Sequence, residues 1–138
     1  MASPESIVET SDPETQSQIT IEPQELKPEQ IKQLIELAQK EGETEARFIL
    51  VLEEWRRQGE SYEDKAEFSV IFGEADIVKI EDIDEGYPYR RISKYLVIPK
   101  TVPTIVLWHS KWDYDLDRGE SMVVYVFTSE GWKSISVK

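Results

Sequence analysis

The chain has 138 residues, of which 39% are apolar and 32% are charged, with no cysteine and a formal net charge of −12 at pH 7. A chain of this length can bury one hydrophobic core and is too short to divide comfortably into two. Its negative charge disfavours nucleic acid and anionic lipid, which bind through Lys and Arg, and the absence of cysteine excludes disulfides, thiolate catalysis and Cys-based metal sites.

The first 25 residues are predicted to form a disordered acidic tail and linker. Residues 1–18 are rich in Ser, Thr, Glu, Asp and Gln, and such a segment cannot bury enough surface to offset the entropy lost on folding. Residues 19–22 alternate apolar and polar and form either a short edge strand or a linker. The N-terminus lacks the pattern of a signal peptide, and no run approaches the ~20 apolar residues of a spanning helix. We therefore expect a cytoplasmic protein with no membrane insertion.

Residues 26–138 are predicted to form a single α+β domain that begins with a helix at about Pro28. Proline suits the first helical position because its missing N–H costs nothing there, and Leu26 can pack on Ile31 as a hydrophobic staple. The apolar residues then follow the i, i+3, i+4, i+7 spacing of one buried stripe, at Ile31, Leu34, Ile35 and Ala38. Gly42 is placed to end this helix.

The segment from Glu43 to Gly59 contains the apolar run 48–52, whose periodicity alone does not separate a buried strand from a buried helix. Phe48, Val51, Leu52 and Trp55 fall on one helical face, and Gly59 can cap the end. These features favour a second helix, with a central strand as the alternative.

From Lys65 onward, short β-branched and aromatic runs alternate with turn residues, which is typical of an antiparallel sheet. The predicted strands are 67–72, 77–80, 90–98, 104–112, 121–128 and 132–137. The fold class predicted from this order is α+β, with two N-terminal helices packed on one face of a mainly antiparallel sheet of about five or six strands. No motif identifies a family, and the layout resembles a cystatin-type or NTF2-like cone in outline alone.

Charge is distributed unevenly along the chain. Residues 60–85 hold ten acids and two lysines, a net of −8, whereas residues 86–112 hold five cations and no acid, a net of +5. The acidic block could neutralise these cations within the domain or across a dimer. The basic stretch is interleaved with tyrosines, and Tyr, Trp and Arg are enriched where proteins bind one another.

We therefore predict a non-catalytic protein-interaction module, an accessory, regulatory or assembly factor, that binds a protein partner or forms a homodimer. Its expected partner-binding surface combines strand residues of two segments: Tyr89, Arg90, Arg91, Lys94, Trp108 and Trp112. Nucleic acid is disfavoured as a partner, and no cofactor site is predicted, because no Gly-rich phosphate loop or dinucleotide motif is present.

Two alternatives place chemistry near the single histidine. A small-molecule-binding domain or minor enzyme could use a pocket near His109, with Asp113 assisting proton transfer. Asp113, Asp115 and Asp117 stand at alternate positions, as in a loop that binds Ca²⁺. The twelfth position counted from Asp113 is Val124 rather than Glu, so the match to a calcium loop fails, and a solvated turn is the preferred interpretation.

Overall fold

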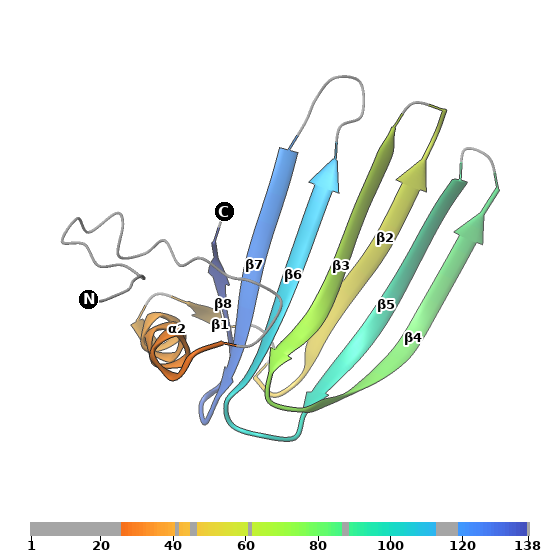
Figure 1. Ribbon diagram of the computed structural model, residues 1–138. Helices are drawn as coiled ribbons and strands as arrows, with labels where there is room; N and C mark the ends of the chain where they lie inside the picture. The colour runs from red at the N-terminus through yellow and green to blue at the C-terminus, as the bar shows by residue number, and fades with distance from the viewer. Residues whose placement is uncertain are drawn as a thin grey trace.

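The computed structural model describes residues 26–40, 42–44, 47–60, 62–86, 89–112 and 119–137. Residues 1–25, with the possible strand at 19–22, lie outside this set. The described elements are helix α2 (Pro28–Lys40) and strands β1 (Glu43–Thr44), β2 (Leu50–Gln58), β3 (Glu63–Phe72), β4 (Ala75–Glu85), β5 (Tyr89–Pro99), β6 (Thr104–Trp112), β7 (Gly119–Thr128) and β8 (Gly131–Ser136). The strands form one antiparallel sheet in the order β1-β8-β7-β6-β3-β2-β5-β4 (Figure 1).

The predicted fold class is wrong. Within the described residues the protein is mostly sheet, with eight antiparallel strands and one short helix, rather than two helices on a sheet of five or six strands. The single helix lies beside β7 and β8, at the end of the sheet opposite β4 (Figure 1). The difference comes almost entirely from the segment 43–59, which was expected to be helical and instead contains β1 and β2.

Strand β2 shows why the helix prediction failed. Leu50 and Leu52 are only 2% and 4% exposed, whereas Val51 between them is 49% exposed, and this alternation is that of a strand. β2 pairs with β3 on one side and β5 on the other. These ladders satisfy its backbone groups through β3, which follows it directly along the chain, and through β5, which is distant in sequence. Periodicity within the segment carries no information about either partner.

The predicted first helix is confirmed. α2 begins at Pro28, buries Leu34 and Ala38 on its apolar stripe, and places Leu26 and Ile31 in the same core cluster. The Gly42 N–H donates to the carbonyl oxygens of Leu37 and Ala38, both at 3.2 Å, which satisfies two carbonyls at the end of the helix.

The six predicted strands are also present, as β3 to β8. β6 spans the predicted residues. The other strands extend beyond their own predicted ranges by one to five residues at one or both ends, and β8 also stops one residue short of its predicted end. The largest extension is in β4, which continues past its predicted end at Ile80 through the predominantly acidic segment 81–85. Its partner cations on β5 lie directly across the ladder, and this pairing explains why so polar a segment is extended.

The sheet is curled, and a short connection requires it to be. β3 and β4 are joined by only Gly73 and Glu74, although β2 and β5 lie between them in the sheet. Three strand spacings in a flat sheet amount to about 14 Å, whereas three Cα–Cα steps reach at most about 11 Å. The Lys100 N–H and the Thr104 hydroxyl both donate to the Glu74 carbonyl, at 2.8 and 3.2 Å, and tie this link to the β5–β6 connection.

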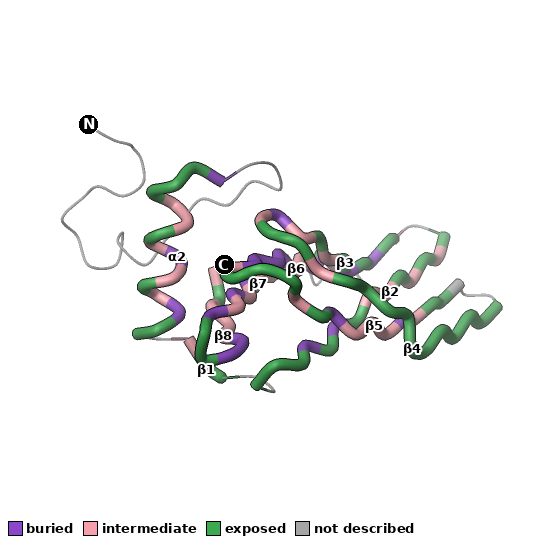
Figure 2. Tube along the Cα trace, turned by 90° about the horizontal axis from the view of Figure 1, so that it is seen from below, coloured by how far each residue is buried: buried purple, intermediate pink, exposed green. Residues whose placement is uncertain are grey.

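The core consists of two clusters. In the first, α2 covers apolar residues of β6 and β7, including Ile105, Leu107, Val124 and Val126. The second joins the start of β2 and the end of β5 to β6 and β8, with Trp132 fully buried among Leu50, Leu52, Val97 and Val106. Neither cluster contains any residue of β4 among its buried members, and Figure 2 shows that strand exposed along almost its whole length.

Candidate interaction surface

The acidic and basic segments meet within the sheet, as the strands β4 and β5. Three ion pairs cross this ladder, from Arg91 to Asp82 at 3.0 Å, from Lys94 to Glu81 at 3.5 Å and from Arg90 to Glu85 at 3.7 Å. Lys94 also lies 4.0 Å from Glu53 of β2. The basic stretch therefore does not form an isolated cationic patch, because the block that precedes it in the chain supplies its counter-ions.

The predicted surface residues lie on different faces. Side chains alternate along a strand, so Arg90 and Lys94 share one face of β5 and Arg91 projects from the other. The Trp108 indole N–H donates to the Glu53 carbonyl oxygen at 2.9 Å, within the second core cluster. The side chain of Tyr89 lies outside the described set.

Trp112, the last residue of β6, lies in the same cross-sheet row as Arg57 and Arg90, but β3 and β2 separate β6 from β5. It is directly opposite Gly119 of β7, and a Cβ on Gly119 would overlap the indole ring. The glycine is therefore required by the close approach of the aromatic ring. Because Arg91 projects from the other face of β5, and β3 and β2 lie between β5 and the two tryptophans of β6, the described side chains of the predicted set do not form one continuous surface.

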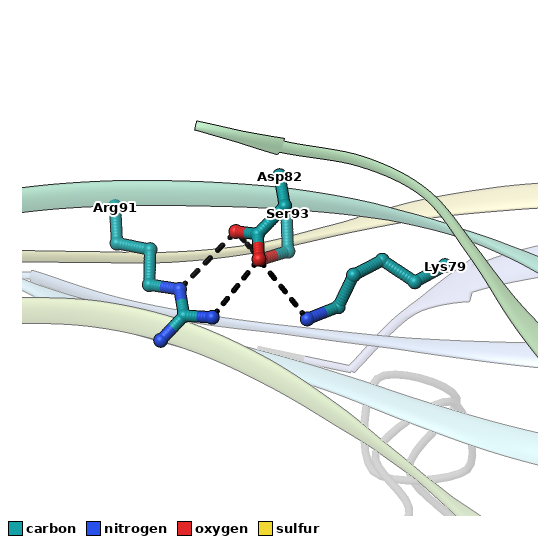
Figure 3. Close-up of polar contacts among 4 residues, drawn as sticks. All are labelled: Lys79, Asp82, Arg91 and Ser93. Atoms are coloured by element: carbon teal, nitrogen blue, oxygen red, sulfur yellow. Dashed lines mark hydrogen bonds and ion pairs between the residues drawn. The ribbon is translucent and has the colours of Figure 1, made fainter. Parts of the chain in front are cut away.

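On the Arg91 face, Asp82 accepts hydrogen bonds from three side chains (Figure 3). Arg91 donates through Nε and Nη2 at 3.2 and 3.0 Å, the Ser93 hydroxyl at 3.0 Å and Lys79 at 3.2 Å. These hydrogen bonds, with that of Arg91 the largest contribution, hold the pKa of the Asp82 carboxyl far below its ordinary value. The cluster joins β4 to β5 through charge.

Stability should therefore depend on pH through Asp82. Because its pKa is lower in the folded chain than in the unfolded chain, the stabilisation is complete above about pH 4 and is lost as the pH falls below that value. We expect Asp82→Asn to lose less of its free energy of unfolding than the wild-type chain between about pH 6 and about pH 2. Urea unfolding at a series of pH values measures this, and parallel curves for the two proteins would contradict it.

His109 contacts Glu120, with 2.6 Å between Nε2 and Oε2. It projects from the same face of β6 as Leu107, toward the side that α2 covers further along the strand. It lines neither of the two hollows described below. Asp113, its expected assistant, lies outside the described residues.

The calcium alternative concerns Asp113, Asp115 and Asp117, all of which fall in the segment 113–118 that the structure does not describe. Among the residues that it does describe, no group of three or more acidic or histidine side chains is arranged to hold a metal ion.

The described helix is too short and too polar to span a membrane.

A different surface stands out once β2 is known to be a strand. The odd-numbered residues of β2 share one face with their partners on β5 and β4, which we call the open face. Its rows across the three strands, read from the pairing register, are Val51–Leu96–Val78, Glu53–Lys94–Glu81, Trp55–Ile92–Ile83 and Arg57–Arg90–Glu85. Two apolar rows thus alternate with two charged rows.

Three of the six residues in the apolar rows are exposed, and the other three, Trp55, Ile92 and Leu96, are half-buried. Val51, Val78 and Ile83 are 49%, 45% and 41% exposed, whereas the apolar residues of β6 and β7 beneath α2 are buried. Each apolar row is a strip bordered by charged residues, and exposed apolar surface rimmed by polar residues typically marks a site of interaction. The open face was missed in the sequence because a helical 43–59 does not place Val51 and Trp55 beside β5.

A hollow of about 220 Å³ lies at one end of the open face. It is lined by Trp55, Arg56, Arg57, Arg90 and Ile92, of which all except Arg56 belong to the open face by strand alternation. No acidic residue is among its lining residues. It thus combines an indole, an aliphatic side chain and two guanidinium groups.

No family model, curated protein or solved structure matches this chain. A function for the open face must therefore be inferred from its residues and their geometry.

The second hollow, of about 310 Å³, differs from the first in charge. Its lining residues are Glu54, Trp55, Arg56, Glu63, Lys65, Ala66, Glu67, Arg91 and Ser93. Acids and cations are equal in number, and several are already paired, as in the 2.6 Å contact between Arg56 and Glu63. Because its charges balance within the chain, this hollow does not favour a ligand of either sign.

Proposed function

We propose that this protein is a non-catalytic interaction module of the cytoplasm, an accessory, regulatory or assembly factor, that binds a protein partner through the open face. The observation that carries the proposal is the exposure of three apolar residues in these rows, Val51 on β2 and Val78 and Ile83 on β4, without any described element over them. A cytoplasmic location fits the absence of cysteine. The proposed surface retains Arg90 and Lys94 from the sequence-based prediction and adds Trp55 and Ile83.

The chemistry of the open face favours a protein over other partners. Trp and Arg are the residues most often found at binding hot spots, and alternating apolar and charged rows give both buried contact and specificity. Nucleic acid is disfavoured, because Glu53, Glu81 and Glu85 stand among the cations of this face and the whole chain carries −12.

The free edge of β4 is a less suitable contact than the face. β4 is the last strand in the sheet order, so its outer backbone groups pair with no other described strand. It carries five acids and one lysine, and its register shifts between Lys79 and Glu81. Charges and bulges on an edge strand oppose pairing with another strand, which leaves the side chains of the face as the proposed surface.

Substitutions on the open face should abolish partner capture. The full chain, tagged at its C-terminus, would be purified from its native host as wild type, Ile83→Glu and Val78→Glu, and co-purifying proteins quantified by mass spectrometry. We expect a stoichiometric companion that falls by about tenfold or more in both variants, because a charge in the apolar row costs more than about 1.4 kcal/mol of binding free energy.

The matched control is Val102→Glu. Val102 is 62% exposed but lies in the β5–β6 connection, away from the open face. This variant should capture the companion in wild-type amounts. Thermal unfolding of each variant establishes that it is folded, and equal capture by Ile83→Glu, Val102→Glu and the wild type would refute the proposal.

A further inference from the structure

The hollow beside Trp55 has an unusual charge arrangement. Arg57 and Arg90 lie directly opposite each other in the β2–β5 register, and like charges at such positions are destabilising. The next pair on the other face, Arg56 and Arg91, repeats the arrangement. Four guanidinium groups therefore gather at the ends of two neighbouring strands.

The counter-ions of these arginines lie to the sides of the hollow and not in it. Arg57 donates to the buried Asp64 of β3 at 2.6 Å. Arg90 lies 3.7 Å from Glu85 of β4, which is beyond hydrogen-bond distance, and its side chain is 51% exposed. Arg90 thus carries a guanidinium that is only weakly engaged by the described residues, at the mouth of a hollow with no acid in its lining.

From this arrangement we propose that the hollow binds a carboxylate side chain of the protein partner, presented by a segment in which an acidic residue is flanked by apolar ones. The proposal rests on the proposed function and specifies the chemistry of the partner. Arg90 would pair with the carboxylate, for which the planar guanidinium is well suited. The Trp55 indole and Ile92 would pack against the apolar neighbours.

A single carboxylate fits this site better than a polyanion. On the same face, Glu85 stands in the row of Arg90 and Glu81 and Glu53 stand two rows away, and they would repel a chain of phosphates. A second copy of this protein is also disfavoured, because two chains of net charge −12 repel each other at long range. One acid between two apolar residues places its charge at Arg90 and keeps the rest of the contact neutral.

The test uses two peptides that differ in one group, acetyl-Val-Leu-Glu-Leu-Val-amide and its Gln counterpart. Each is titrated into the ¹⁵N-labelled full-length chain, and the indole N–H of Trp55 and the amides of Arg90 and Ile92 are followed by NMR. We expect the Glu peptide to bind about tenfold more tightly, the difference expected for one charge-assisted hydrogen bond. Arg90→Gln should bring the two affinities to within about twofold of each other.

The matched control is Arg91→Gln, on the adjacent residue of the opposite face, which should keep the tenfold preference. Equal affinities for the two peptides in the wild-type chain, or the same loss in both arginine variants, would overturn the proposal. So would inorganic phosphate displacing the Glu peptide at equal concentration, since this indicates a phosphate site. Sedimentation showing a dimer that Ile83→Glu dissociates would identify a second copy as the occupant and would also overturn it.

Failure of this inference is distinguishable from failure of the proposed function. Arg90→Gln can be compared with Ile83→Glu in the same capture experiment. If Ile83→Glu loses the companion and Arg90→Gln keeps it, the open face stands and the carboxylate proposal falls. If both variants keep it, the proposed function falls as well.

Discussion

Leu52→Ala is expected to lower the free energy of unfolding by about 2–5 kcal/mol, the usual effect of truncating a buried leucine. Val51→Ala, at the neighbouring position, should lower it by less than about 1 kcal/mol. Leucine exceeds valine by only one methylene, which accounts for about 0.8 kcal/mol when buried, but Leu52 lies in the second core cluster and Val51 on the open face. Urea unfolding followed by tryptophan fluorescence measures both values.

This comparison tests the strand assignment of β2. In a helix, Val51 and Leu52 would both fall on the apolar stripe with Phe48 and Trp55, and both truncations would be costly. Similar losses for the two variants, each above about 2 kcal/mol, would therefore contradict the strand and restore the helix that periodicity favoured.

The second large effect is expected at the buried ion pair of β2 and β3. Arg57→Ala removes the guanidinium that hydrogen-bonds Asp64 through Nε and Nη2, and Asp64 is fully buried. Leaving a buried carboxylate without this partner should cost about 2–3 kcal/mol, the lower part of the range for buried pairs because Arg57 is itself partly exposed. Chemical unfolding measures the loss.

Arg56→Ala supplies the control on the next residue of the same strand. Arg56 also contacts an acid at 2.6 Å, but its partner Glu63 is exposed where Asp64 is buried, and exposed pairs contribute about 0–1 kcal/mol. Asp64→Ala supplies a second control, because Arg57→Ala in that background should cost much less. Equal losses for the two arginine variants, or additive losses for Arg57→Ala and Asp64→Ala, would exclude the assigned role of the buried pair.

Local signals in the sequence sufficed for α2 and for most of the sheet. The proline at the helix start, the spacing of Ile31, Leu34, Ile35 and Ala38 and the terminating Gly42 all act within a few residues of one another. The strands of the C-terminal half are short β-branched runs between turn residues, so their ranges also follow from neighbouring residues.

The segment 43–59 could not be settled in this way, because its state depends on distant partners. Leu50 and Leu52 pack on Val97 and Val106, at least 45 residues away along the chain, and the ladder with β5 joins the segment to residues that are also distant in sequence. The apolar residues of this segment fit both a helical and a strand periodicity, and only tertiary packing distinguishes the two structures. The error then concealed the open face, since its rows exist only when β2 lies beside β5.

The opposed charge segments were visible in the sequence, and one of the two interpretations given to them holds. The acids of β4 neutralise the cations of β5 within the chain, as the pair between Asp82 and Arg91 shows. What charge counting could not supply is the face on which each cation lies. Alternation along β5 separates Arg90 from Arg91, and only Arg90 reaches the hollow beside Trp55.

Hydroxyl-radical footprinting of the chain, alone and in complex with the companion purified from its host, tests the open face most directly. The rate of oxidation at Trp55 should fall several-fold in the complex, while the rate at Met122, which stands across from His109 on the opposite face of the sheet, stays constant. Protection of Met122 with Trp55 left unchanged would place the partner on the other face and contradict the account.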